Sequence, residues 1–284
     1  MAQKTAVITE KKINHRKNFV KTFEKISYKY AGRSVWYDFV YMCATALSQP
    51  IDFRQDREDE YLRKINAYGK DEQNLFPEML GELTFVFEDE RFGDILGEIY
   101  SSLGMTNAKN GQFFTPYNVC KMMAAMQTSK ERLPAEIEQK GYITVNDPCC
   151  GAGALLIAFA EQCMECGVNY QNSILFVAQD IDPTAALMCY VQMALLGMPG
   201  YVIIGNTLSN HIPEAESIWY TPMYFLHGFQ YRTQTVIYEE NGIESGPNDI
   251  VRQPETQAVI IPVTDMDIVL RETESGQFTF DMAG

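Results

Sequence analysis

The feature that most constrains the fold is a glycine-rich turn between a short β-type run and a helical segment. The run Tyr142–Val145 leads into Asp-Pro-Cys-Cys-Gly-Ala-Gly-Ala-Leu at residues 147–155, and helical periodicity continues to Cys166. Glycines let the backbone turn tightly and approach a ligand, and the start of a helix offers unpaired N–H donors. This order predicts a ligand site at the carboxyl end of a strand, although an ordinary strand-to-helix turn is the competing interpretation.

The strand and helix pattern then repeats along the chain. Residues 173–178 and 201–204 predict a second and a third strand, and Pro183–Leu196 predicts the helix between them, with Asp182 as its N-cap. The β-α-β-α-β order is typical of an α/β protein with a parallel, doubly wound sheet. Helical periodicity also marks residues 11–49 and 75–103, which predicts an N-terminal helical subdomain.

Three parts are therefore expected along the chain. They are a helical N-terminal subdomain at 1–105, an α/β domain at 106–238, and an acidic tail or short hairpin at 239–284. The last part carries one β-like run at 258–263 and ten acidic against two basic residues. No chemistry can be assigned to it from the sequence.

Composition excludes several classes of protein. The 284 residues are 46% hydrophobic and 21% charged, which is typical of a globular protein and not of a disordered chain. No apolar run approaches the roughly 18 residues of a membrane span, and residues 1–10 are too polar for a signal-peptide core, so the expected location is the cytoplasm. Seven cysteines, an odd number, suit a reducing compartment.

Charge gives a weaker indication of partners. The net charge is −14, yet residues 1–33 hold nine basic and two acidic residues. Such a basic segment could contact phosphates, but an ordinary solvated helical face is the competing interpretation. Cys163 and Cys166 lack a second ligand pair and lie in an expected helix, so no metal site is predicted.

Two strand ends add polar side chains to the glycine turn. Asp180 ends the second strand, where a carboxylate can accept hydrogen bonds from both hydroxyls of a ribose. Asp182 is better explained as a helix N-cap. Asn206 follows the third strand and could hydrogen-bond an adenine edge. The turn and these side chains together suit a nucleoside cofactor.

Further motifs bring a family resemblance. Upstream lie Leu-Gly-x-x-Tyr at 96–100 and Gly-Gln-Phe-Phe-Thr-Pro at 111–116, and downstream Gly-Asn-Thr-Leu at 205–208. With the turn and Asp180, these motifs follow the order of the adenine-N6 DNA methyltransferase family. The chain resembles in particular the modification subunits of type I restriction systems.

The resemblance implies a Rossmann-like methyltransferase sheet that binds S-adenosylmethionine. By carry-over, residues 114–116 lie near the methionine end of the cofactor, the turn surrounds its amino-acid moiety, Asp180 holds the ribose and Asn206 the adenine. The family usually has Asp where Asn206 stands, and Asn keeps an acceptor oxygen. The implied cofactor-binding residues are Phe114, Thr115, Pro116, Asp147, Gly151, Gly153, Asp180, Ile181 and Asn206.

One family motif is missing. Members that methylate adenine carry Asn or Asp, Pro-Pro and an aromatic residue at the end of the fourth strand, where the motif holds the flipped base. None of the 12 prolines is adjacent to another. The nearest substitute is Thr221, Pro222 and Tyr224, which are the candidate catalytic residues of a degenerate motif. A buried strand is the competing interpretation of this aromatic run.

The sequence therefore predicts an adenine-N6 DNA methyltransferase-like protein that binds S-adenosylmethionine, with weak or no methyl transfer on its own. The alternatives are a non-catalytic binding or regulatory subunit with a methyltransferase fold, and a methyltransferase for a non-DNA substrate. About 60 residues follow Tyr224, too few for a typical recognition domain. DNA is therefore expected to be reached through a separate specificity or partner subunit, and no membrane partner is expected.

Overall fold

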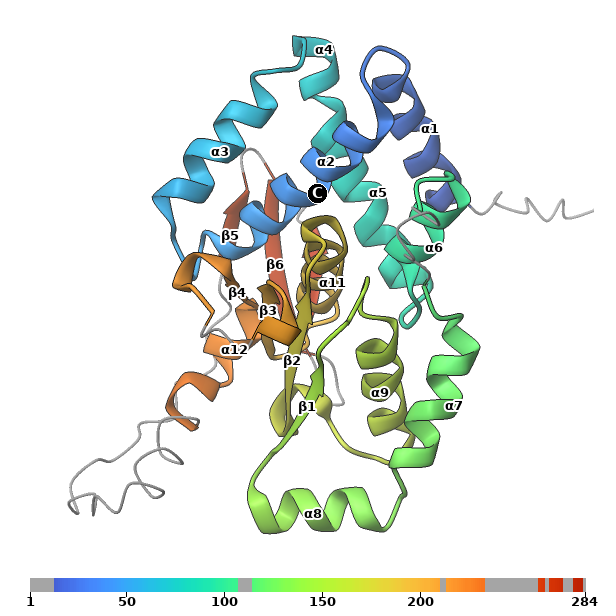
Figure 1. Cartoon of the computed structure of the whole chain (residues 1–284), viewed down its shortest axis with the longest axis vertical. Coiled ribbons are helices and arrows are strands. Elements are labelled where there is room, and N and C mark those ends of the chain that lie inside the picture. The colour runs from blue at the N-terminus through green and yellow to red at the C-terminus, as the bar shows by residue number, and fades with distance from the viewer. Residues whose placement is uncertain are drawn as a thin grey trace, which may run out of the picture.

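The computed structural model describes residues 13–106, 114–209 and 213–232, and the backbone of strands at 260–263, 266–272 and 278–282. The fold is a mixed α/β arrangement in which helices predominate (Figure 1). The helices before the first strand are α1 His15–Ser27, α2 Gly32–Ser48, α3 Gln55–Ile65, α4 Lys70–Gln73, α5 Leu75–Asp89, α6 Ile95–Ser102, α7 Tyr117–Gln127 and α8 Arg132–Lys140.

The second half of the described chain alternates strands and helices. In order, its elements are β1 Ile143–Asp147, α9 Ala154–Glu165, α10 Tyr170–Ser173, β2 Ile174–Asp180, α11 Pro183–Leu195, β3 Gly200–Ile204, η2 Thr207–Ser209, η3 Ala215–Ser217, β4 Ile218–Tyr220 and α12 Pro222–Leu226. A separate antiparallel sheet follows, made of β5 Ile260–Val263, β6 Met266–Glu272 and β7 Phe278–Met282. The sequence indicated only the first of those three strands.

The main sheet has the order β1-β2-β3-β4, with β1, β2 and β3 parallel and β4 antiparallel to β3. The three predicted parallel strands and their connecting helices are confirmed to within two residues at each end. A doubly wound sheet requires a reversal of strand order, and among the described residues there is none. Because right-handed crossovers that run in one direction stay on one side, α9 and α11 cover the same face.

The helical N-terminal half packs on this α/β half through one continuous core. Buried side chains of α1, α2 and α5 belong to the same apolar cluster as those of α9, α11 and β2. The Trp36 ring nitrogen donates to the Met188 sulfur of α11 at 3.3 Å. The Arg57 guanidinium, 2% exposed, lies 3.7 Å from the Trp219 ring centroid and donates to the Ile218 carbonyl at 2.6 Å. Because the helical half and the α/β half share one core, the structure does not separate them, and the three-part division of the chain stays a prediction.

Two of the expected helical segments are divided. The segment 11–49 contains α1 and α2, because the chain extends at Ala31 (ψ 119°) before Gly32 starts the second helix. The segment 75–103 contains α5 and α6, because Gly93 has a φ of 155° and Asp94 then caps α6 by accepting from the Gly97 amide at 3.0 Å. No helix among the described residues is long and apolar enough to span a membrane.

Candidate cofactor site

The glycine turn lies between β1 and α9, as the sequence predicts. Gly151 and Gly153 have φ values of 55° and 96°, a region that other residues rarely adopt. A Cβ on Gly151 would lie 3.2 Å from the Phe114 ring, and a Cβ on Gly153 only 2.8 Å from the Cys189 sulfur. Gly153 is therefore required by backbone geometry and by close packing, whereas a side chain at Gly151 would strain the backbone and would need a small shift of the Phe114 ring.

Asp180, at the end of β2, fastens this turn. One carboxylate oxygen accepts from the Gly151 amide at 2.8 Å, and the other accepts from the Asp182 amide at 2.9 Å. The Cys150 amide also donates to the Gln179 carbonyl at 2.9 Å. Each Asp180 oxygen keeps a second lone pair for a ligand hydroxyl. Asp182 accepts from the Thr184 amide at 2.8 Å, which confirms it as the N-cap of α11.

The end of β3 joins the same edge of the sheet. The Gly205 amide donates to the Asp180 carbonyl at 2.9 Å, and the Thr207 hydroxyl donates to the Pro148 carbonyl at 2.6 Å. The side-chain oxygen of Asn206 accepts from the Leu208 amide at 3.0 Å, and the side-chain NH2 group can still donate to a ligand. The carboxyl ends of β1, β2 and β3 therefore form one continuous polar edge of the sheet, which we call the cofactor edge.

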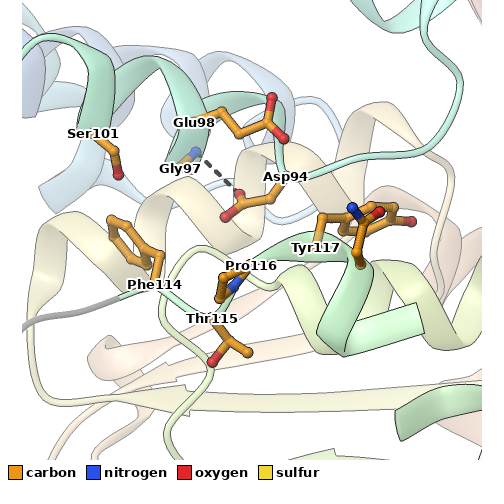
Figure 2. A pocket seen from close by; sticks show the side chains of 9 residues that line it. Asp94, Gly97, Glu98, Ser101, Phe114, Thr115, Pro116 and Tyr117 are labelled. Atoms are coloured by element: carbon orange, nitrogen blue, oxygen red, sulfur yellow. Dashed lines mark hydrogen bonds between the residues drawn. The ribbon is translucent and has the colours of Figure 1, made fainter. Parts of the chain in front are cut away.

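A cavity of about 460 Å³ opens beside the turn (Figure 2). It lies between α6 and the segment that enters α7, and Phe114, which packs against Gly151, forms part of its wall. Its lining residues are Asp94, Gly97, Glu98, Ser101, Phe114, Thr115, Pro116, Tyr117 and Asn118. The structure thus brings Phe114, Thr115 and Pro116 to one pocket, next to the turn that holds Asp147, Gly151 and Gly153.

Carboxylates dominate the electrostatics of this region. Asp94 is 3% exposed, and this burial raises the pKa of its carboxyl group. Hydrogen bonds from Gln192 and Gly97 favour the charged form and partly oppose this effect. Burial also raises the pKa of Asp147, and the charge of nearby Asp180 raises it further. A bound cationic group would stabilise these carboxylates in their charged forms.

One residue of the site was not found by sequence reasoning. Gln192 of α11 is fully buried, and its amide nitrogen donates to Asp94 at 2.9 Å and to the Ala152 carbonyl at 2.7 Å. Its amide oxygen accepts from the Leu96 amide at 3.0 Å. Gln192 therefore ties the start of α6 to the glycine turn. It lies in an apolar helical stretch, and only a polar residue in such a stretch could have indicated it.

The candidate catalytic residues lie near the amino end of β3, opposite the carboxyl ends that form the cofactor edge. Because β4 is antiparallel to β3, Thr221 lies beside Gly200, at the start of β3, while Asn206 follows its end. Five residues of strand separate the two ends by roughly 13 Å. The structure therefore does not bring Thr221, Pro222 and Tyr224 to the cofactor edge.

Their contacts are those of packed core residues. The fully buried Thr221 hydroxyl donates to the Met198 carbonyl at 2.8 Å and accepts from the Gly200 amide at 3.0 Å. Tyr224 packs 4.8 Å from the Tyr220 ring, between centroids, on the second face of the sheet. The competing interpretation of a buried strand is correct for β4, whereas Pro222 and Tyr224 belong to α12.

The paired cysteines are buried, and one residue of the basic N-terminal segment forms ion pairs. Cys163 and Cys166 are buried on and after α9, and no group of three or more potential metal ligands occurs in the described part of the chain. Arg16 of the basic N-terminal segment pairs with Glu90 and Glu98, both at 2.8 Å. Ile181, in contrast, is 67% exposed at the cofactor edge, where a planar ring could cover it.

The fold is that of a mixed α/β protein with a polar site at the carboxyl ends of its parallel strands, and comparison places it in a family. Residues 88–235, more than half of the chain, match the family described as N-6 DNA Methylase, and the chain belongs to that family. The match includes α6, the glycine turn, Asp180, Asn206 and Tyr224.

A curated relative agrees with this assignment. Over 131 residues the chain is 31% identical to the type I restriction enzyme MjaVIII methylase subunit of Methanocaldococcus jannaschii. The match covers 44% of this chain and 20% of that subunit, so the chain spans about a fifth of the relative's length. No solved structure matches the chain.

Proposed function

We propose that the chain binds S-adenosylmethionine along the cofactor edge, as an adenine-N6 methyltransferase-like protein with a Rossmann-like sheet. The observation that carries this proposal is the convergence of the glycine turn, Asp180 and Asn206 on one edge, with the acidic cavity beside them. The cofactor has a cationic amino group and sulfonium, a ribose diol and an adenine. The cationic groups match the carboxylates beside the turn. The ribose diol matches Asp180 at the end of β2, and the adenine matches the side-chain amide of Asn206.

Each part of the cofactor has a proposed set of residues. Asp147 and the two glycines receive the amino-acid moiety, with Phe114, Thr115 and Pro116 beside the methionine chain. Asp180 accepts from the ribose hydroxyls, Ile181 covers the adenine, and Asn206 bonds its edge. The 67% exposure of Ile181 supports its role, because an adenine would bury this apolar surface.

Methyl transfer by the chain alone is proposed to be weak or absent. Thr221 uses its hydroxyl within the sheet and lies at the edge away from the cofactor, so it cannot hold a target adenine near the methyl donor. This placement favours the second candidate function, a binding or regulatory subunit that contacts DNA through a partner. A non-DNA substrate has no specific support in the described contacts.

Calorimetric titration of the full chain with S-adenosylmethionine tests cofactor binding. We expect a saturable isotherm that Asp180→Ala weakens about 5- to 150-fold, since a charged hydrogen bond worth about 1 to 3 kcal/mol is lost. Asp182→Asn is the matched control, because it keeps the N-cap acceptor and lies outside the ribose position. No binding at millimolar cofactor would refute the proposal.

Methyl transfer needs its own measurement. The chain is incubated with methyl-labelled cofactor and mixed-sequence duplex DNA, and adenine-N6 labelling is counted. We expect little or no label. Robust labelling that disappears in both Thr221→Ala and Tyr224→Ala would show that these residues form a working catalytic motif.

A further inference from the structure

One wall of the cavity is built on the start of α7. Residues 114–116 form this wall and lead directly into the helix. The Pro116 carbonyl accepts from the amides of Val119 and Cys120 at 2.9 and 3.2 Å. The Cys120 thiol also donates to the Thr115 carbonyl at 3.8 Å. The wall is therefore fastened to the first turn of α7, and its position depends on where α7 lies.

Helix α7 packs on α9, the helix that starts at the glycine turn (Figure 1). The Ile157 amide donates to the Gly153 carbonyl at 3.0 Å, so the turn continues without a break into α9. The buried side chains of α7 are Cys120 and Ala124, both of them small. Burial of apolar surface is non-directional and does not by itself fix how far along α9 the helix lies. Polar contacts between the two helices can fix this position.

Glu161 of α9 makes two such contacts. One carboxylate oxygen accepts from the Tyr117 hydroxyl at 2.8 Å, and the other accepts from the Lys121 ammonium at 2.7 Å. Tyr117 and Lys121 are four positions apart, so both project from one face of α7. The Glu161 side chain is 20% exposed. Glu161 therefore holds the first two turns of α7 against α9, and we call these three residues the Glu161 clamp.

Tyr117 belongs to both the clamp and the cavity. It lines the cavity together with Phe114 (Figure 2), whereas Glu161 is not one of the lining residues. Burial and the hydrogen bond to Glu161 raise the pKa of Tyr117, so its hydroxyl stays protonated at neutral pH and donates. At the other end of the wall, the Phe114 ring lies close to Gly151. The clamp therefore acts on the spacing between residues 114–116 and the glycine turn.

We propose that Glu161 is a positioning residue for the methionine part of S-adenosylmethionine. Through Tyr117 and Lys121 it sets the spacing between the two walls that receive the amino-acid moiety, and this spacing determines the affinity for that moiety. Asp180 and Asn206, which receive the adenosine part, are held by backbone amides of the cofactor edge. This inference rests on the proposed function and names a residue on which that same site depends.

Substitutions at Glu161 test the inference by calorimetry of the full chain with S-adenosylmethionine. Glu161→Leu removes both contacts and should weaken binding about tenfold, the effect of one or two lost hydrogen bonds. Glu161→Gln keeps an acceptor for Tyr117 and loses only a partly exposed ion pair, so its affinity should stay within about threefold of the wild type. The matched control is Glu136→Leu on α8, which removes an ion pair with Lys140 of the same 2.7 Å length and should leave the affinity unchanged.

A truncated ligand separates positioning from a general loss of structure. Methylthioadenosine has the adenosine part of the cofactor but no amino-acid moiety, and its binding is measured by saturation-transfer NMR at millimolar concentration. We expect Glu161→Leu and Tyr117→Phe to leave its affinity as in the wild type, while both weaken S-adenosylmethionine binding. Circular dichroism should be the same for all variants. Tyr117→Phe, which keeps the ring and loses only the hydroxyl, decides the question if Glu161→Leu does not fold.

Other outcomes overturn the inference. Unchanged affinity for S-adenosylmethionine in Glu161→Leu, or equal losses in Glu161→Leu and Glu161→Gln, would show that the clamp does not position the wall. Parallel loss of affinity for both ligands would give the clamp a general structural role instead. A wild type that binds S-adenosylmethionine but not methylthioadenosine would show that the two parts of the cofactor are not held separately.

The same titrations distinguish the two proposals. If the wild type does not bind S-adenosylmethionine at all, the proposed function fails. Binding by the wild type with any of the outcomes above refutes the role of Glu161 alone.

Discussion

The side-chain amide of Gln192 donates a 2.9 Å hydrogen bond to the carboxylate of Asp94, across 98 positions of sequence. The same side-chain nitrogen donates to the Ala152 carbonyl, and the side-chain oxygen accepts from the Leu96 backbone amide. Helix α6, which lines the cavity, and the turn that starts α9 are thereby held by one side chain of α11. The distance between the cavity and the glycine turn depends on this fully buried contact.

Replacing Gln192 with Leu should therefore loosen both the fold and the cofactor edge. The substitution leaves a buried carboxylate, a carbonyl and an amide without this partner, and we expect it to lower the free energy of unfolding by about 3 kcal/mol. Urea denaturation checks the value, and calorimetry should show weaker S-adenosylmethionine binding. Gln162→Leu on α9 is the control, since this half-buried amide makes a weak hydrogen bond to the Cys166 sulfur, at 3.9 Å. Equal stability of the two variants would contradict the role assigned to Gln192.

Local patterns predicted the parts of the site that are local. Asp182 before Pro183 is a helix start in the sequence and in the structure, and the glycine turn lies where a strand run meets a helical run. Gln192 could not be assigned, because its partners lie 40 to 98 positions away and no short-range pattern encodes them. The contact of Asp180 with the Gly151 amide was likewise not predicted, because the two residues lie 29 positions apart, and the ribose-binding role of Asp180 stays a prediction.

The direction of a short strand was equally beyond sequence reasoning. The three residues of β4 give an apolar run that fits either direction, and their antiparallel pairing with β3 is decided by tertiary contacts. Arg57 over Trp219 and the hydrogen bonds of Thr221 are such contacts. Alignment by spacing alone therefore placed Thr221 at the catalytic position. In the fold, Thr221 lies beside the amino end of β3, away from the cofactor edge.

Thr221→Val should destabilise the protein without weakening cofactor binding. Valine has nearly the same shape but leaves the Gly200 amide and the Met198 carbonyl without the hydroxyl, which costs about 1 to 3 kcal/mol. Thr221→Ser keeps the hydroxyl and should retain most of the stability. Urea denaturation and calorimetry give the two readouts. A Val variant of unchanged stability would show that this hydroxyl has no structural role.

His227 should make the protein sensitive to acid. Burial lowers its pKa to about 4, with Arg232 adding a smaller effect, whereas an unfolded histidine titrates near about 6.5. The unfolded state therefore binds a proton first as the pH falls. The stabilisation from neutral His227 is complete above about pH 6.5 and is lost progressively toward pH 4.

His227→Gln removes this titration and should flatten the dependence of stability on pH between 7 and 4.5. Urea denaturation at four pH values in this range, for both proteins, measures the two slopes. The wild type should lose more stability on acidification than the variant. Parallel curves would mean that His227 has the same pKa in the folded and unfolded states.

Gly153 should be the least replaceable glycine of the turn. Alanine at this position meets two penalties: a φ of 96°, and a Cβ only 2.8 Å from the Cys189 sulfur. Gly167→Ala, at a φ of 76° with open space around it, meets the backbone penalty alone. We expect Gly153→Ala to cost about 1 to 3 kcal/mol more than this control, because overpacking adds to strain. Adding Cys189→Ala to Gly153→Ala should recover part of the difference in urea denaturation, since it removes the sulfur and leaves the strain. If the double variant is no more stable than Gly153→Ala alone, the contact with Cys189 is not what excludes a side chain from this turn.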